Sequence, residues 1–331
     1  MPAPSLSPSF HDPIPEIPDD VLRVLVTGFG PFFRYRENAS WLAAKPLNNV
    51  ILDLEPPPDR MIEDVLPGFE CSGGYVKKRP RWVHITSLQL PLTYQAVLDI
   101  APGLQARPPI LPPSNDPMHL LTPPPETGYN FVFHLGLAGR GPLRMERLGH
   151  RIGYRMKDTT GMHAPIVDYM PDPPPLEQSQ TEVLENAARL AALMGPRLAE
   201  SAMDVVHSPL DAVTDSPTRG FGKGYEMFAD DVFAAIDVEK LVHDLKEDGL
   251  DCPTMQNIYS SMDAGHYVND FLYYCSLCEA KRAVMKHDRQ GMTRVLFMHC
   301  PPADQPFTTQ EVIEAVKKII CWVCRSEDFT R

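Results

Sequence analysis

Short apolar runs rich in β-branched residues alternate along the chain with longer segments whose apolar residues recur every three or four positions. The short runs, typical of buried strands, are LRVLVTGF from residue 22, VHITSLQL from 83, YNFVFHLGL from 129, MQNIYSS from 255 and RVLFMHC from 294. The helical segments are TYQAVLDIA from 93, TEVLENAARLAALMG from 181, VEKLVHDLKEDG from 238, AGHYVNDFLYYCSLCEAKRAV from 264 and TTQEVIEAVKKIICWVC from 308. The region from Thr308 to Glu311 supplies a cap for the last helix. Because strands alternate with helices, we predict a three-layer α/β/α fold with an open, mostly parallel twisted sheet.

Prolines interrupt this pattern at several places. The chain has 36 of them, clustered in stretches such as LEPPPDR, ARPPILPPSNDP and MPDPPPLE, which cannot be helix interiors or central strands. We predict a proline-rich disordered tail at residues 1–20 and a single α/β domain at 21–331. The domain carries proline-rich loop insertions at about 55–81, 106–127, 169–180 and 208–230. Such segments dock on aromatic grooves in the polyproline II form or serve only as spacers.

Charge and hydropathy exclude several classes of protein. The formal net charge is -12, whereas a surface that follows nucleic-acid phosphates needs clustered Lys and Arg. No apolar run reaches the roughly 18 to 20 residues of a membrane span. The first twenty residues lack the basic and apolar regions of a secretory signal. We therefore expect a cytoplasmic protein that binds neither nucleic acid nor membrane; the oligomeric state is open.

The seven cysteines indicate reduced thiols, because their number is odd and no secretory signal is present. Cys275 with Cys278 and Cys321 with Cys324 have metal-like spacing and together suggest a four-thiolate zinc site. Both pairs fall in apolar stretches predicted to be helical, which favours the alternative that they are buried small hydrophobic residues. We accordingly predict no metal and no cofactor.

Ligands of such sheets gather at the carboxyl ends of the strands, where this chain carries distinctive sequences. Val24 to Phe32 reads VLVTGFGPF, and Asn38 to Ser40 follows as NAS. His134 to Arg140 reads HLGLAGR, 145–147 reads MER and 149–158 reads GHRIGYRMKD. Towards the C-terminus, 263–277 reads DAGHYVNDFLYYCSL and 297–301 reads FMHCP. In this order the segments resemble the pyroglutamyl-peptidase I family, cytosolic cysteine peptidases that remove an N-terminal pyroglutamate. GHRIGYRMKD resembles the variant found in fungal-type members.

The resemblance implies a set of roles. In the family a thiolate attacks the carbonyl, a histidine moves the proton and a carboxylate orients the histidine. By correspondence, His299 is the base, Glu146 the orienting carboxylate, and the nucleophile position falls on Asn269. The substrate-binding residues implied are Phe29, Phe32 and Arg155, with a peptide bearing an N-terminal pyroglutamate or a similar lactam as the partner.

Each role has an ordinary structural alternative. His299 on its own could be a partly buried structural histidine, and Glu146 a surface carboxylate beside an arginine. Phe29 and Phe32 could be core residues, although aromatic faces also suit a flat lactam ring. Arg155 needs an alignment gap to match the family arginine.

Asn269 leaves the activity of the chain open, because an amide is not a nucleophile at neutral pH. Cys275 lies about 240° around the predicted helix and about 9 Å along it, so it faces away; Cys278 does not replace the thiol either. Cys300 follows His299 on a strand and points to the other side of the sheet. Two hypotheses follow: a pyroglutamyl-peptidase-type hydrolase with residual or altered activity, or an inactive homologue that binds lactams, peptides or other proteins.

Overall fold

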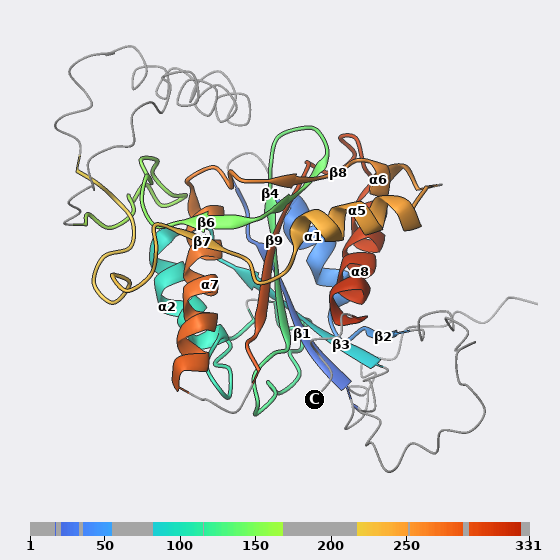
Figure 1. The fold of residues 1–331 in the computed structure, drawn as a ribbon, viewed down its shortest axis with the longest axis horizontal. Helices are drawn as coiled ribbons and strands as arrows, with labels where there is room; N and C mark the ends of the chain where they lie inside the picture. Colours follow the sequence, from blue (N-terminus) through green and yellow to red (C-terminus); the bar gives the residue numbers. More distant parts are fainter. Residues whose placement is uncertain are drawn as a thin grey trace, which may run out of the picture.

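A computed structural model describes residues 17, 21–32, 36–54, 82–114, 116–167, 217–250, 252–286 and 291–325. A central sheet lies between two groups of helices (Figure 1). The predicted tail at 1–20, except Ile17, and the predicted helix at 181–195 lie outside the described residues. The same holds for the predicted insertions at 55–81 and 169–180.

The central sheet has seven strands in the described part of the chain, in the order β2-β3-β1-β4-β9-β5-β8. They are β1 (Val21–Phe29), β2 (Ile51–Asp53), β3 (Trp82–Leu90), β4 (Phe131–Leu137), β5 (Leu143–Glu146), β8 (Ile258–Ser261) and β9 (Arg294–Cys300). The strands β3, β1, β4 and β9 are parallel to one another, and β8 is parallel to β5. Only β2 against β3 and β5 against β9 pair antiparallel. The predicted fold class, with a mostly parallel sheet, is confirmed.

Helices cover both faces of this sheet. They are α1 (Ala39–Ala44), α2 (Tyr94–Leu104), α5 (Val238–Asp248), α6 (Pro253–Gln256), α7 (Val268–Lys286) and α8 (Thr309–Arg325). In Figure 1, α2 and α7 lie on one side of the sheet, and α1, α5, α6 and α8 on the other. Side chains alternate accordingly: Val24 and Val26 of β1 pack in the core with α1 and α8, whereas Leu25 packs in the core with α2 and α7. Each such buried aliphatic side chain stabilises the fold by roughly 1.5–3 kcal/mol.

Side-chain hydrogen bonds cap the N-termini of two helices, α8 and α1. The Thr308 hydroxyl accepts a hydrogen bond from Glu311 N at 3.2 Å, and Glu311 Oε2 accepts from Thr308 N at 2.8 Å. These reciprocal bonds form the predicted cap of α8. Asn38 caps α1, because its Oδ1 accepts from Ser40 N at 3.1 Å. The predicted strand MQNIYSS is only partly a strand, since Pro253 starts the short helix α6 and β8 begins at Ile258.

The described part of the predicted insertion at 208–230 packs against α7. The Phe221 ring stacks on Phe271 with centroids 3.9 Å apart, and the Tyr225 hydroxyl donates to Glu279 Oε1 at 2.7 Å. The next residues lead into β7 (Asp231–Phe233), which pairs antiparallel with β6 (Leu148–His150). This small sheet brings His150 close to the beginning of α7.

The predicted insertion at 106–127 lies instead along β3 and the 3-10 turn η1 (Lys45–Leu47). Lys45 forms an ion pair with Asp116 at 2.9 Å, and the hydroxyls of Thr86 and Thr122 lie 3.0 Å apart. A hollow of about 470 Å³ is lined by residues of this segment, from Leu111 onward. It shares no lining residue with the site described next.

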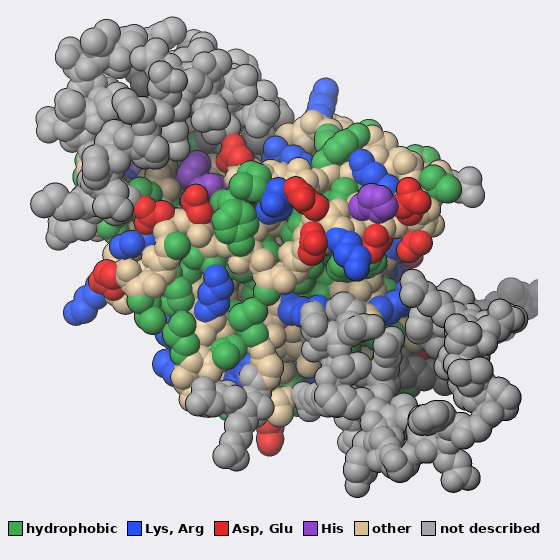
Figure 2. All heavy atoms as spheres, in the orientation of Figure 1, with side chains coloured by type: hydrophobic (Ala, Val, Ile, Leu, Met, Phe, Trp, Pro, Cys, Tyr) green, Lys and Arg blue, Asp and Glu red, His purple; other side chains and the backbone are tan. Residues whose placement is uncertain are grey.

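The visible surface carries charges of both signs. Figure 2 shows acidic and basic side chains side by side over the region of α5, with apolar side chains between them. The described side chains visible on this face form no continuous basic patch. Within the described residues, no helix is both long and apolar enough to cross a membrane.

Candidate active site

Strand alternation brings His299 and Glu146 to the same face of the sheet. The neighbours of His299 on β9, Met298 and Cys300, belong to the core on the α8 side, and so does Met145 of β5. His299 and Glu146 therefore point to the other face, toward α7. The antiparallel pairing of β5 with β9 sets the two side chains near each other. Both are buried, His299 with 3% and Glu146 with no exposed surface.

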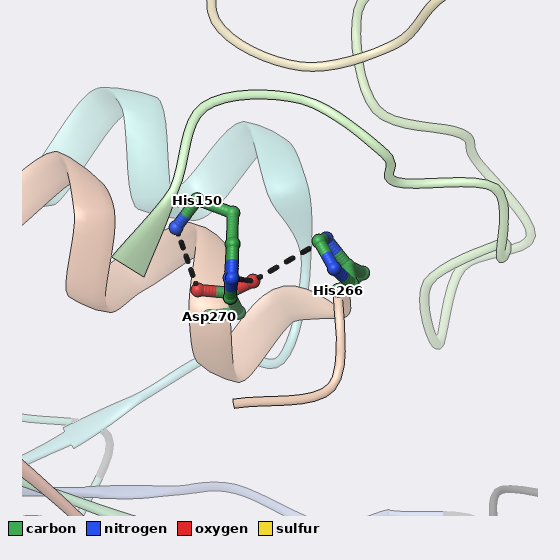
Figure 3. A group of neighbouring side chains, drawn as sticks. All are labelled: His150, His266 and Asp270. Carbon is green, nitrogen blue, oxygen red and sulfur yellow. Dashed lines mark hydrogen bonds and ion pairs between the residues drawn. The ribbon is translucent and has the colours of Figure 1, made fainter. Parts of the chain in front are cut away.

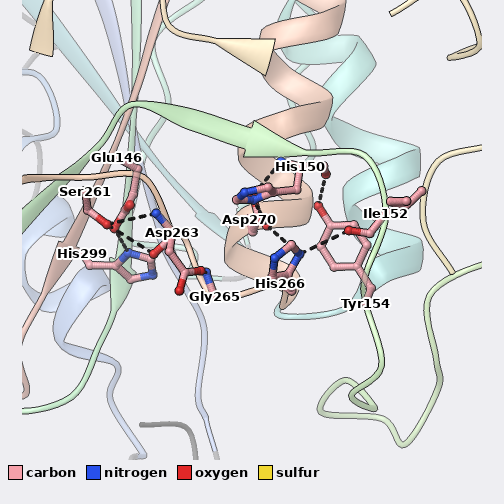
Figure 4. A network of polar contacts seen from close by, with 10 residues as sticks. All are labelled: Glu146, His150, Ile152, Tyr154, Ser261, Asp263, Gly265, His266, Asp270 and His299. Carbon is pink, nitrogen blue, oxygen red and sulfur yellow. Dashed lines mark hydrogen bonds and ion pairs between the residues drawn. The ribbon is translucent and has the colours of Figure 1, made fainter. Parts of the chain in front are cut away.

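A short hydrogen bond joins the two side chains. His299 Nδ1 lies 2.7 Å from Glu146 Oε1, and Figure 4 shows the ring and the carboxylate in direct contact. A carboxylate only accepts hydrogen bonds, so we assign the ring proton to Nδ1. His299 Nε2 is then unprotonated and presents its lone pair as an acceptor. Such a pair orients an imidazole for accepting a proton at Nε2.

Asn269 occupies the position in front of that lone pair. It is the second residue of α7, and its Nδ2 lies 3.1 Å from His299 Nε2 and 3.3 Å from Leu137 O. Both partners are acceptors, which fixes the orientation of the amide with nitrogen toward them. The structure thus brings Asn269, His299 and Glu146 into one line of hydrogen bonds. The Asn269 amide donates a hydrogen bond to His299 Nε2 and keeps its proton, whereas a catalytic thiol at this position would transfer its proton to that nitrogen.

Two residues that the sequence did not single out support this arrangement. A Cβ added to Gly136 of β4 would lie 2.5 Å from Phe297 Cζ and 3.1 Å from Asn269 Cγ, so glycine leaves room for the Phe297 ring of β9 and the Asn269 side chain. The Tyr273 hydroxyl donates to the backbone oxygen of Glu146 at 2.9 Å. Gly136 lies in the HLGLAGR sequence, and Tyr273 is one helical turn after Asn269, which are the signals that could have identified them.

The three residues assigned to substrate binding are not equally placed. Phe29 is buried in the core on the α7 side. Phe32 is half-buried, and its ring centroid lies 6.1 Å from that of Tyr267, just before α7. Arg155 is exposed, and no contact among the described residues links its side chain to His299, Glu146 or Asn269. The structure brings only Phe32 of the three to the partly exposed surface beside the start of α7.

The cysteines are distributed as their helical and strand positions predict. Cys275 and Cys278 are buried on the α7 side of the sheet. Cys324 is buried in the opposite core with Cys321 packed against that core, and Cys300 lies there too. The sheet separates the two pairs, so the zinc-site alternative is wrong. The six cysteines in the described ranges are free thiols. Burial raises the pKa of the Cys278 and Cys300 thiols to about 12, so neither offers a thiolate to replace the missing one.

A second polar cluster, unpredicted from the sequence, begins at the residue after Asn269. Asp270 is fully buried, and its Oδ2 lies 2.8 Å from His150 Nδ1 and 3.7 Å from His266 Nδ1 (Figure 3). Burial acts to lower the pKa of His150, but the hydrogen bond to Asp270 and nearby carboxylate charges raise it above the usual value. Figure 4 shows this cluster beside the His299 site.

The fold and the site together define a three-layer α/β protein with a buried histidine–carboxylate pair and an asparagine at the helix start facing the histidine. Its sequence is similar to those of known peptidases. It is 25% identical over 298 residues to pyroglutamyl-peptidase 1 of Mus musculus, covering 90% of this chain and 87% of the mouse protein. The human pyroglutamyl-peptidase 1 is 24% identical with the same coverage. No family model matches the chain.

Solved structures share the fold. Pyroglutamyl peptidase I from Bacillus amyloliquefaciens superposes with a TM-score of 0.51 at 15% identity, covering 92% of this chain and 96% of that chain. A mutant pyrrolidone carboxyl peptidase from P. furiosus gives a TM-score of 0.50 at 17% identity, covering 92% and 99%. At these identities the structural similarity shows the α/β fold.

Proposed function

We propose that this chain is a member of the pyroglutamyl-peptidase I family that binds an N-terminal pyroglutamyl group or a similar lactam but does not form the covalent intermediate of a cysteine peptidase. The observation that carries the proposal is the line of hydrogen bonds from Asn269 through His299 to Glu146. We also propose that the chain belongs to the fungal-type subgroup, because residues 149–158 resemble that variant. We propose a cytoplasmic location, which is consistent with the free thiols of the described cysteines.

The chemistry of Asn269 explains the loss of the covalent step. In a thiol–imidazole pair the sulfur gives its proton to Nε2 and attacks the carbonyl as a thiolate. The Asn269 amide keeps its proton and donates it in a hydrogen bond to the same nitrogen. It has no electron pair that is nucleophilic at neutral pH. The aromatic side of the site, where Phe32 meets Tyr267, is unaffected and suits the face of a flat lactam ring.

A second candidate function is hydrolysis by a water molecule that His299 activates. The retained His299–Glu146 pair favours this water mechanism, because a buried carboxylate that orients a histidine is useful when the histidine acts as a base. The water would have to displace the Asn269 amide from Nε2 or approach beside it. This step has no acyl-enzyme and would be slower than thiol chemistry.

Cleavage and binding of a pyroglutamyl peptide test the proposal together. We expect the parent protein to bind the peptide by calorimetry without cleaving a pyroglutamyl fluorogenic amide. Asn269→Cys should gain cleavage by more than about 1,000-fold, the order of what a nucleophile contributes in a triad. Asn269→Ser is the matched control, because a hydroxyl in the same place is a weaker nucleophile than a thiol.

Two outcomes separate the candidates. Cleavage by the parent that His299→Ala abolishes would establish the water mechanism and contradict the proposal. If the parent does not bind the peptide and the cysteine variant does not cleave, lactam recognition is absent and only the fold is shared.

A further inference from the structure

A cluster of two histidines and one aspartate lies at the start of α7, on a different side of the helix from His299 (Figure 4). We propose that His150, His266 and Asp270 form a binding site for a divalent transition-metal cation, with Zn²⁺ as the best fit. Neither the sequence pattern nor the proposed lactam binding assigns a metal to this chain.

The distances among the three side chains are close to those of a cation site. Asp270 Oδ2 lies 2.8 Å from His150 Nδ1 and 3.7 Å from His266 Nδ1, and one ligand atom from each of the three residues lies within 4.8 Å of the others. Ligands about 2.0–2.1 Å from a tetrahedral zinc are roughly 3.3 Å apart. These separations differ from that value by a few tenths of an ångström up to at most about 1.5 Å, so modest side-chain shifts would close the site around an ion.

The donor types point to a transition metal. Two imidazoles and one carboxylate suit Zn²⁺ and related ions, whereas Mg²⁺ and Ca²⁺ prefer oxygen ligands throughout. Three protein ligands also leave a coordination position open for water or another ligand. The exposed fractions of the His150 and His266 side chains, 17% and 37%, give an ion access from solvent.

The backbone holds the three side chains in place. Asp270 Oδ1 accepts a hydrogen bond from His150 N at 3.0 Å, which anchors the carboxylate to β6. His266 has a φ of 44°, an uncommon conformation for a residue other than glycine. A Cβ on Gly153 would lie 2.9 Å from His266 Nδ1, so glycine is required where the ring sits. An uncommon backbone conformation maintained by its surroundings is frequent at ligand sites.

Other histidine–carboxylate pairs in the described ranges lack these properties. His299 and Glu146 are only two ligands and are almost fully enclosed. His243 lies 3.5 Å from Asp244, but its side chain is 72% exposed and no third ligand is near enough to complete a group. His243 therefore provides a matched control.

The experiment titrates Zn²⁺ into the full chain after treatment with a chelator, using isothermal calorimetry. We expect one site per chain in the parent and an affinity at least about tenfold lower in His266→Ala, since even outer-shell partners of a metal contribute 10- to 100-fold. His243→Ala should bind as the parent does. His266 is partly exposed, so this variant is expected to fold, and a thermal melt without metal checks it.

Co²⁺ provides a second readout that does not depend on activity. The parent should give visible ligand-field absorption at one equivalent of Co²⁺, and Asp270→Asn should reduce it. The proposal is overturned if Zn²⁺ does not bind stoichiometrically, or if His266→Ala binds it as tightly as the parent. Loss of binding in His299→Ala alone would place the ion at the other site and also overturn it.

Discussion

Two histidine sites flank the start of α7, and consecutive residues of that helix serve them. Asn269 faces His299, and Asp270 faces His150, because successive helical residues point about 100° apart. Both nitrogens of His299 have partners within a closed site. At the other site, two partly exposed histidines share one carboxylate. A single step along the helix therefore separates a closed site with one oriented histidine from a more open cluster of two histidines around a carboxylate.

The largest expected effect tests whether the closed site still acts as a catalytic unit. In the Asn269→Cys background, Glu146→Gln should lower pyroglutamyl-amide cleavage by about 10²- to 10⁴-fold. The uncharged glutamine side chain no longer fixes the tautomer of His299 as the carboxylate does. Steady-state kinetics measure the loss. The fold should remain, as judged by an unchanged circular-dichroism spectrum. Cleavage that persists undiminished would show that Glu146 is not the orienting group.

The second expected effect is a difference in the free energy of unfolding between variants of Asn269 and Asp270. Asp270→Ala removes a buried carboxylate that accepts hydrogen bonds from His150, and we expect the free energy of unfolding to fall by about 3 kcal/mol. Asn269→Ala removes only a neutral amide and should cost about 1 kcal/mol. Urea unfolding of the two variants gives both values. Equal losses would mean that the two sites are anchored alike.

His134, another buried histidine, has no carboxylate partner among the described residues and serves as a reference. His134 on β4 contacts Thr27 Oγ1 at 2.7 Å, and burial lowers its pKa to about 3. The unfolded chain takes up this proton near pH 6.5 and the folded chain does not. Stability should therefore fall with decreasing pH between about 6.5 and 3, by about 1.4 kcal/mol per pH unit from this group.

The comparison of the parent with His134→Gln checks this slope. Chemical unfolding at several pH values in that window should give a shallower decline in the variant. An identical pH dependence in both proteins would show that other groups determine acid stability.

The smallest effect concerns the link between the helix and Glu146. Tyr273→Phe removes the hydrogen bond to the Glu146 backbone oxygen and should lower the free energy of unfolding by about 1 kcal/mol. Zn²⁺ binding at the other site should not change. Thermal melts and the zinc titration measure the two quantities. Altered zinc affinity in this variant would show that the sites are coupled through α7.

The sequence predicts the parallel part of the fold well. RVLFMHC is a strand over the same residues, and the helices containing Asn269 and Thr309 are where periodicity indicates. The three- and four-residue strands β2, β5 and β8 are too short for a periodic pattern. The antiparallel pairings of β2 with β3 and of β5 with β9 depend on contacts across the sheet. Proline at position 253 converts part of a predicted strand into α6.

Some residues of the candidate site can be predicted from the sequence and others cannot. Asn269, His299 and Glu146 could be identified because each lies in a short motif whose order resembles a known family. The cluster of His150, His266 and Asp270 escaped prediction, since His150 is 120 residues from Asp270 and the contact depends on β6 approaching α7. Gly149 permits that approach, as a Cβ there would lie 2.7 Å from Tyr274 N. Spacing along the sequence does not reveal such a contact.

The two outer strands of the central sheet also affect how the protein behaves at high concentration. β2 has three residues and β8 has four, so either border of the sheet offers few unpaired backbone groups to a neighbouring molecule. Long, flat borders are where chains add to one another and aggregate. The short edge strands in the described part of the chain offer few backbone groups for pairing with a strand of another molecule. Contacts between copies of this chain are therefore expected through helix or loop surfaces.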